Sequence, residues 1–169
     1  LENFLSLITN KTKLIFIANP NNPTGTLIDK LTLKSFISKV PENILVILDE
    51  AYDEYLHDDD KSIAFSWLAE FKNILISRSF SKAYGLAGLR VGYGVGSINI
   101  VELMNRVRQP FNVNHFAQLA AIESLKDDEF IEKSRAINNQ GLELIVSAFK
   151  RLSLDYIPSY GNFISFKLQ

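Results

Sequence analysis

The sequence predicts an α/β protein built on a mixed, mostly parallel sheet. Three short, continuous apolar runs have the pattern of buried strands, at residues 14–18, 44–48 and 74–76, and the third strand is expected to extend to Ser77. A polar cluster directly follows each run, and the amphipathic segment at residues 29–40, typical of a helix, separates the first two. The carboxyl ends of parallel strands border the ligand crevice of an open α/β sheet, so we expect a functional site there.

The remaining elements are predicted from apolar spacing and turn residues. They are, in chain order, a helix tail over 1–8, a helical turn over 66–71, a strand over 89–95, a helix over 98–107, a helical stretch over 115–152 that breaks near 126–128, and strands over 154–157 and 162–168. We expect a domain change within the long helical stretch. Residues 1–118 would belong to a large domain, and residues 119–169 would form an interdomain helix and the start of a small α+β C-terminal domain.

Composition excludes several classes of function. The chain has 169 residues, a net charge of -1 and no cysteine, which excludes disulfides, thiolate catalysis and zinc–thiolate sites. The charge argues against a nucleic-acid partner or a membrane surface, and no apolar run approaches the roughly 20 residues of a membrane span. We expect a cytoplasmic protein. Because the chain opens on Leu1 rather than Met, we interpret it as an internal fragment of a longer protein.

Three polar stretches carry the candidate chemistry. Lys82 lies in a segment rich in small and hydroxyl residues, and a neutral lysine amine is a nucleophile that can form a Schiff base. Alone, such a lysine is more often a solvated surface residue. Asp49 directly follows a buried strand, so it either caps the next segment or meets a cation. Residues 19–25 form either a plain turn or a loop whose Asn amides point into a crevice.

Taken together, these stretches resemble the fold-type I, class I/II aminotransferases, which use pyridoxal 5'-phosphate (PLP). The resemblance rests on NPNNPTG at 19–25, DEAY at 49–52, and SFSK at 79–82 with Arg90, in that order and at family-like spacing. Residues 82–90 followed by 108–114 are most similar to the histidinol-phosphate aminotransferase branch. The resemblance covers essentially the whole chain. It implies a three-layer α/β/α large domain of the PLP-dependent transferase type.

The resemblance also implies a role for each matching residue. Lys82 would form the Schiff base with PLP and then shuttle a proton, which requires an amine that is both nucleophilic and basic. Asp49 would pair with the protonated pyridine nitrogen of the cofactor. Tyr52 and Asn22 would hydrogen-bond its phenolic oxygen. The bond between Asn22 and Pro23 is expected to be cis, as it is in relatives.

The cofactor's phosphate would be held by Ser79, Ser81 and Arg90, with Arg90 making a charge-assisted contact. Family members also use a phosphate loop and a ring-stacking aromatic residue that would precede Leu1. A carboxylate-binding arginine would follow Gln169. Relatives build each site from two subunits, so the resemblance implies a homodimer. No metal site is expected.

The function implied is the exchange of an amino group between an amino donor and an oxo acid. L-histidinol phosphate and 2-oxoglutarate are the first substrates to expect. One alternative is a PLP-dependent decarboxylase of a phosphorylated amino acid, which would keep every motif above. Another is the aminotransferase-like ligand-sensing domain of a transcription regulator, which would carry a DNA-binding segment upstream.

Overall fold

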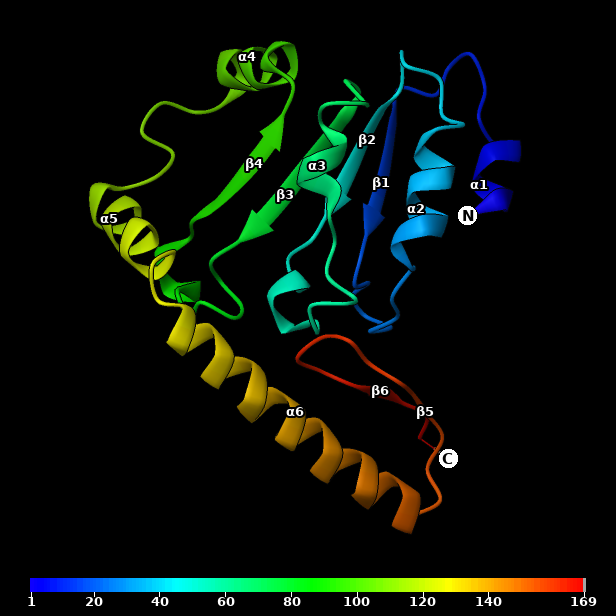
Figure 1. The fold of residues 1–169 in the computed structure, drawn as a ribbon, viewed down its shortest axis with the longest axis vertical. Helices are drawn as coiled ribbons and strands as arrows, with labels where there is room; N and C mark the ends of the chain where they lie inside the picture. The colour runs from blue at the N-terminus through cyan, green and yellow to red at the C-terminus, as the bar shows by residue number, and fades with distance from the viewer. Residues whose placement is uncertain (169) are drawn as a thin grey trace.

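A four-stranded sheet forms the centre of the computed structural model, which describes residues 1–168 (Figure 1). Its strands are β1 (Leu14–Ala18), β2 (Leu45–Asp49), β3 (Ile74–Ser79) and β4 (Gly92–Gly96), in the order β1-β2-β3-β4. The first three strands are parallel, and β4 runs antiparallel to β3. The predicted mixed, mostly parallel sheet is therefore confirmed.

The main core lies between one face of this sheet and the helices α2 (Lys30–Ile37) and α3 (Ala64–Trp67). The strands contribute alternate residues to it, and the helices contribute large apolar side chains. Its buried members include Ile15, Ile17, Val46, Leu48, Ile74 and Ile76 from the strands, and Leu33, Phe36, Ile37 and Trp67 from the helices. A period of two puts all of these strand residues on the same face.

The apolar run at residues 14–18 predicts a strand buried on both faces, and this is wrong for β1, which is buried on one face only. Leu14 and Phe16 point to the face opposite the core and are 51% and 66% exposed. On that face the described part of the chain supplies α4 (Ile98–Val107), which packs near β4 through Met104. A continuous apolar run thus identified the strand correctly, although it did not reveal which face the described helices cover.

The helices after the sheet follow the predicted pattern, including its break. α5 spans His115–Ser124 and α6 spans Asp128–Arg151, so the helical stretch is interrupted at residues 125–127. Asp127 caps α6, because its carboxylate accepts a hydrogen bond from the amide of Phe130 at 3.0 Å. The chain begins with the short helix α1 (Glu2–Ser6).

Two predicted boundaries are corrected. The strand expected over 89–95 begins only at Gly92, because the 3₁₀ helix η2 (Ala87–Leu89) occupies the preceding residues. The two expected C-terminal strands are reduced to the short hairpin pair β5 (Tyr156–Ile157) and β6 (Ser165–Phe166). The division at residues 118/119 stays a prediction.

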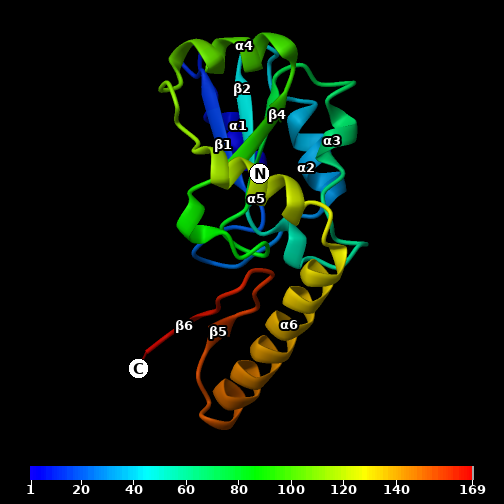
Figure 2. The same ribbon diagram turned by 90° about the vertical axis from the view of Figure 1, so that its left-hand side faces the viewer.

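The C-terminal hairpin and the start of α6 lie near the carboxyl ends of β1, β2 and β3 (Figures 1 and 2). The amide of Tyr160 donates to the carbonyl of Gly25 at 2.8 Å, which joins the hairpin to the loop after β1. Arg135 of α6 donates to the carbonyl of Glu54 at 3.1 Å, and Glu54 lies within the 3₁₀ helix η1 (Asp53–Tyr55). These contacts hold the hairpin and α6 next to the carboxyl ends of the strands, where the site is predicted. None of the described helices is long and apolar enough to cross a membrane.

Candidate active site

The carboxyl ends of the three parallel strands bring the predicted motifs together. The loop 19–25 follows β1, Asp49 is the last residue of β2, and the segment 79–82 begins at the end of β3. In the parallel register Asp49 pairs with Ala18 on one side and with Ser77 on the other. Stretches that are far apart in the sequence therefore meet at one edge of the sheet, as predicted.

Tyr52 is the residue around which the three motifs meet. Its hydroxyl accepts a hydrogen bond from the side-chain amide of Asn22 at 2.9 Å, and the Nζ of Lys82 lies 5.3 Å from its ring centroid. The ring of Phe163, from the hairpin, packs edge-on against the ring of Tyr52 at 5.3 Å between centroids. Tyr52 is buried, so its phenol is fixed between the lysine, the amide and the hairpin.

Ser79, Ser81 and Arg90 lie close together after β3. The hydroxyl of Ser79 accepts from the amide of Ser81 at 3.0 Å, and Nη1 of Arg90 lies 3.5 Å from the hydroxyl of Ser81. Arg90 also donates to the carbonyl of Ala87 at 2.8 Å and has a left-handed backbone with φ of 53°. One cation and two hydroxyls at hydrogen-bonding range suit a phosphate group.

Asp49 is exposed at the end of β2, and its Oδ1 accepts from the amide of Ala51 at 3.1 Å. Of the two roles left open for this acid, the structure shows the cap on the following turn. Its pairing with a cation stays a prediction. The peptide bond between Asn22 and Pro23 is cis, as expected.

Sequence reasoning missed a buried ion cluster beside these residues. Arg78 is buried in β3, and its guanidinium contacts the carboxylates of Glu50, Asp53 and Glu54 at 2.6, 3.0 and 2.9 Å. It also lies over the ring of Phe65, 4.9 Å from the centroid. The buried acid after β2 is therefore Glu50 and not the exposed Asp49. The signal was present, because the period of two in β3 places Arg78 on the buried face with Ile74 and Ile76.

The protonation of this cluster follows from its burial. Burial raises the pKa of Glu50, although the charge of Arg78 acts in the opposite direction. Burial alone would lower the pKa of Arg78, but the three carboxylates outweigh it and raise the pKa, so the guanidinium stays charged. Burial likewise raises the pKa of Tyr84, whose hydroxyl donates to Glu54 at 3.4 Å.

Gly25 shows how closely the hairpin approaches the loop after β1. It is buried with φ of +75°, and a Cβ at this position would overlap the side chain of Ser159. An L-residue would be strained both by the backbone conformation and by the contact. The loop and the hairpin therefore fit together only because residue 25 is glycine.

We expect Gly25→Ala to lower the unfolding free energy of the protein by about 1–3 kcal/mol, which is the usual cost of such backbone strain. The thermal unfolding midpoint should fall accordingly. Gly141→Ala is the matched control, since a Cβ there meets nothing within 4 Å and Gly141 lies within α6. That control should be stabilised by roughly 0.5–1 kcal/mol, the usual gain for alanine over glycine in a helix. Equal effects in calorimetry would contradict the close fit at Gly25.

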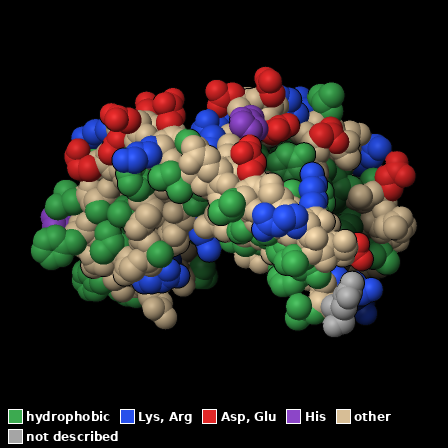
Figure 3. Space-filling model, turned by 90° about the horizontal axis from the view of Figure 1, so that it is seen from below, with side chains coloured by type: hydrophobic (Ala, Val, Ile, Leu, Met, Phe, Trp, Pro, Cys, Tyr) green, Lys and Arg blue, Asp and Glu red, His purple; other side chains and the backbone are tan. Residues whose placement is uncertain are grey.

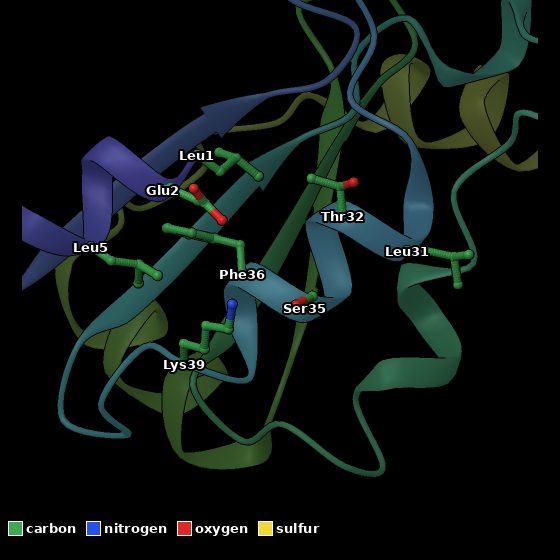
Figure 4. Close-up of a pocket in the computed structure, with 8 residues that line it drawn as sticks. All are labelled: Leu1, Glu2, Leu5, Leu31, Thr32, Ser35, Phe36 and Lys39. Carbon is green, nitrogen blue, oxygen red and sulfur yellow. The ribbon is translucent and has the colours of Figure 1, made fainter.

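One concave region of the structure lies away from the candidate residues. A pocket of about 450 Å³ opens between α1 and α2, lined by Leu1, Glu2, Leu5, Leu31, Thr32, Ser35, Phe36 and Lys39 (Figure 4). None of the seven candidate residues lines it. Within residues 1–168 there is also no group of three or more side chains that could hold a metal ion.

Charged side chains of both signs are interspersed with hydrophobic ones on the face seen in Figure 3. This face carries no continuous basic patch of the kind that binds nucleic acid.

Comparison with known proteins places the chain in one family. The model of the family "Aminotransferase class I and II" matches residues 1–168. A histidinol-phosphate aminotransferase of Methylobacillus flagellatus is 63% identical over 166 residues, which cover 98% of this chain and 45% of that protein. The chain thus spans less than half the length of the curated relatives it matches.

Solved structures agree on the fold. The structure of histidinol-phosphate aminotransferase from Sinorhizobium meliloti in complex with pyridoxal-5'-phosphate matches 98% of this chain and 45% of its own, with a TM-score of 0.91 and 29% identity. L-threonine-O-3-phosphate decarboxylase from Porphyromonas gingivalis matches 94% of this chain and 48% of its own with a TM-score of 0.82, and at 24% identity it shows the fold alone. The predicted α/β transferase fold is confirmed, and the chain belongs to the class I and II aminotransferase family.

Proposed function

We propose that this chain is part of a PLP-dependent aminotransferase that takes the amino group from L-histidinol phosphate and passes it to an oxo acid such as 2-oxoglutarate. The observation that carries the proposal is the meeting of Lys82, Tyr52 and Asn22, which come from three separate motifs, around one buried phenol. The names of the curated relatives support the choice of donor. Activity is proposed for the complete protein.

The residues present fit PLP. Arg90 with Ser79 and Ser81 offers a cation and two hydroxyls for its phosphate, and the primary amine of Lys82 is the group that would bond to its aldehyde carbon. PLP, when bound, supplies an electron-withdrawing ring that stabilises negative charge at the substrate Cα.

Three further side chains would act on the same cofactor. The carboxylate of Asp49 would keep a proton on the ring nitrogen. The hydroxyl of Tyr52 and the amide of Asn22 would orient the phenolic oxygen. Lys82 Nζ, once released, would move a proton to and from the substrate Cα, which a basic amine close to the carbon can do.

The decarboxylase remains the main competing proposal. It would use the same residues and the same fold, and the choice depends on which bond at Cα the substrate-binding groups hold perpendicular to the ring. The aminotransferase is favoured because relatives with that name reach 63% identity, against 24% for the decarboxylase structure. A ligand-sensing domain of a transcription regulator is a third candidate, which an upstream DNA-binding segment in the full reading frame would favour.

We also propose a cytoplasmic homodimer. Apolar side chains exposed on α4 and α5 support an interface, and so does the nearly fully exposed Phe111 between them, which has a left-handed backbone with φ of 55°. We expect the complete protein to sediment at twice its monomer mass, and a monomeric holoenzyme would contradict this.

The test of function is a visible absorption spectrum of the complete protein with PLP. Adding L-histidinol phosphate without an oxo acid should remove the band of lysine-bound PLP and accumulate pyridoxamine phosphate. A band that persists would contradict the proposed donor. L-histidinol phosphate has no carboxylate to lose, so the decarboxylase is tested separately by adding a phosphorylated amino acid, and release of carbon dioxide from it would support that alternative. Absence of any band would contradict the assignment of Lys82.

A further inference from the structure

We propose that Arg78 is a positioning residue of this active site, which holds the turn that carries Tyr52 and the segment that carries Lys82 at a fixed separation. The inference rests on the proposed function, because it concerns how two residues of that site are placed. Arg78 itself would touch neither substrate nor cofactor.

The guanidinium of Arg78 contacts three acids in the turn that carries Tyr52. Nε and Nη2 both reach Oε2 of Glu50, at 2.8 and 2.6 Å, Nη2 reaches Asp53 at 3.0 Å and Nη1 reaches Glu54 at 2.9 Å. These three acids lie on both sides of Tyr52 in the chain. One guanidinium therefore fixes the turn before and after the tyrosine.

The segment that carries Lys82 is held by residues before and after the lysine. Arg78 lies four residues before the lysine, at the end of β3, and Tyr84 lies two residues after it. The hydroxyl of Tyr84 donates to the same Oε1 of Glu54 that Arg78 contacts, at 3.4 Å. The lysine segment is thus tied to the tyrosine turn at both of its ends.

The cluster also connects this pair to α6. The side chain of Arg135 donates to the backbone carbonyl of Glu54 at 3.1 Å. The turn is thereby held from the sheet by Arg78 and from the helix by Arg135.

The energetics favour positioning over stability. Buried ion pairs commonly contribute little net stability, because desolvation offsets their attraction. Here one buried cation faces three carboxylates, and Oε1 of Glu50 has no hydrogen-bond partner among the described residues. A planar fork with several fixed donors can reach three divergent carboxylates, whereas a lysine ammonium is a point charge on a flexible stem. The arrangement therefore depends on arginine geometry and not on positive charge alone.

The test is Arg78→Lys in the complete protein, which keeps the charge and removes the fork. The wild-type protein is first shown to form lysine-bound PLP. In the variant, kcat should fall by about 10–100-fold with KM within about threefold, because a displacement near 1 Å can cost 10²-fold and Arg78 does not touch substrate. The absorption band of lysine-bound PLP is also titrated with pH. Its midpoint should rise by about half a pH unit or more, because Tyr52 would no longer donate a well-placed hydrogen bond to the ionised phenolic oxygen, which favours the deprotonated form.

A second measurement uses the protein without PLP. We compare the rates at which cyanate carbamylates Lys82 and the exposed Lys126 in the same sample, by peptide mass spectrometry. Loosening the turn should expose Lys82 from beside the Tyr52 ring and raise its relative rate by about threefold or more. This measurement reports positioning even if the wild-type protein shows no PLP band, an outcome that would count against the proposed function alone.

Two more variants keep the inference falsifiable. Glu54→Gln changes the partly exposed member of the cluster. It should shift kcat, the pH midpoint and the carbamylation rate in the same direction as Arg78→Lys but by less. It replaces Arg78→Lys as the test if that variant does not fold. Lys34→Met, which breaks the exposed 2.7 Å pair with Glu70, is the matched control and should leave all of them unchanged. If Arg78→Lys and Glu54→Gln lower only the thermal midpoint, with wild-type kcat, pH midpoint and carbamylation rate, the positioning role is overturned.

Discussion

Lys82→Ala should abolish the covalent attachment of PLP and lower transamination by at least about 10⁴-fold, because proton transfer alone contributes 10²–10⁴-fold and the covalent link is lost as well. Lys82 is half-buried beside Tyr52, with its Nζ 5.3 Å from the ring centroid. No other residue of the three motifs offers an amine. The measurements are the visible spectrum with PLP, borohydride reduction followed by mass spectrometry, and the rate of the first half-reaction.

The control for this variant is Lys126→Ala. Lys126 is exposed and pairs with Glu123, three residues earlier in the chain, so its loss should change neither the spectrum nor the rate. A Lys82→Ala enzyme that still turned over at the normal rate would remove the lysine from the mechanism. Partial recovery of its activity by a small added amine would support the proton-transfer role specifically.

The placement of the site was predictable because strand ends are local signals. The runs at 14–18, 44–48 and 74–76 predicted three parallel strands, and the polar clusters after them predicted where Asn22, Asp49 and Lys82 would gather. The resemblance implied that Asn22 and Tyr52 both act on the cofactor's phenolic oxygen, but the hydrogen bond between the two side chains was not predicted. Their separation of thirty residues leaves no local pattern that would reveal it.

The buried ion cluster was not predicted, because burial of a charged residue depends on partners from other segments. Arg78 becomes tolerable inside the protein only once Glu50, Asp53 and Glu54 are folded against it. The position of Asp49 directly after a strand left open whether it caps the next segment or meets a cation, and it drew attention away from Glu50. Alternation along the strand decides otherwise, and it turns Glu50 toward Arg78 and Asp49 toward the exposed face.

Asp49→Asn isolates the charge of that exposed acid from its structural contact. The asparagine carbonyl can still accept the hydrogen bond that Asp49 Oδ1 receives from the amide of Ala51, so the turn should keep its shape. The negative charge that would hold a proton on the ring nitrogen is lost. We expect the first half-reaction to slow by about 10²–10³-fold, equivalent to about 2.7–4 kcal/mol, the size of effect seen when one electrostatic partner of a transition state is removed.

PLP binding should weaken far less than the rate, because Lys82 and the phosphate contacts of Arg90 remain. Asp60→Asn, in the exposed loop after η1, removes the same charge from the same chain and should leave the rate unchanged. The first half-reaction of each variant is followed by stopped-flow absorption at a saturating concentration of L-histidinol phosphate. A normal rate in Asp49→Asn would mean that the acid serves only to cap the turn after β2, and the electron-withdrawing power of the ring would then have to be maintained by another group.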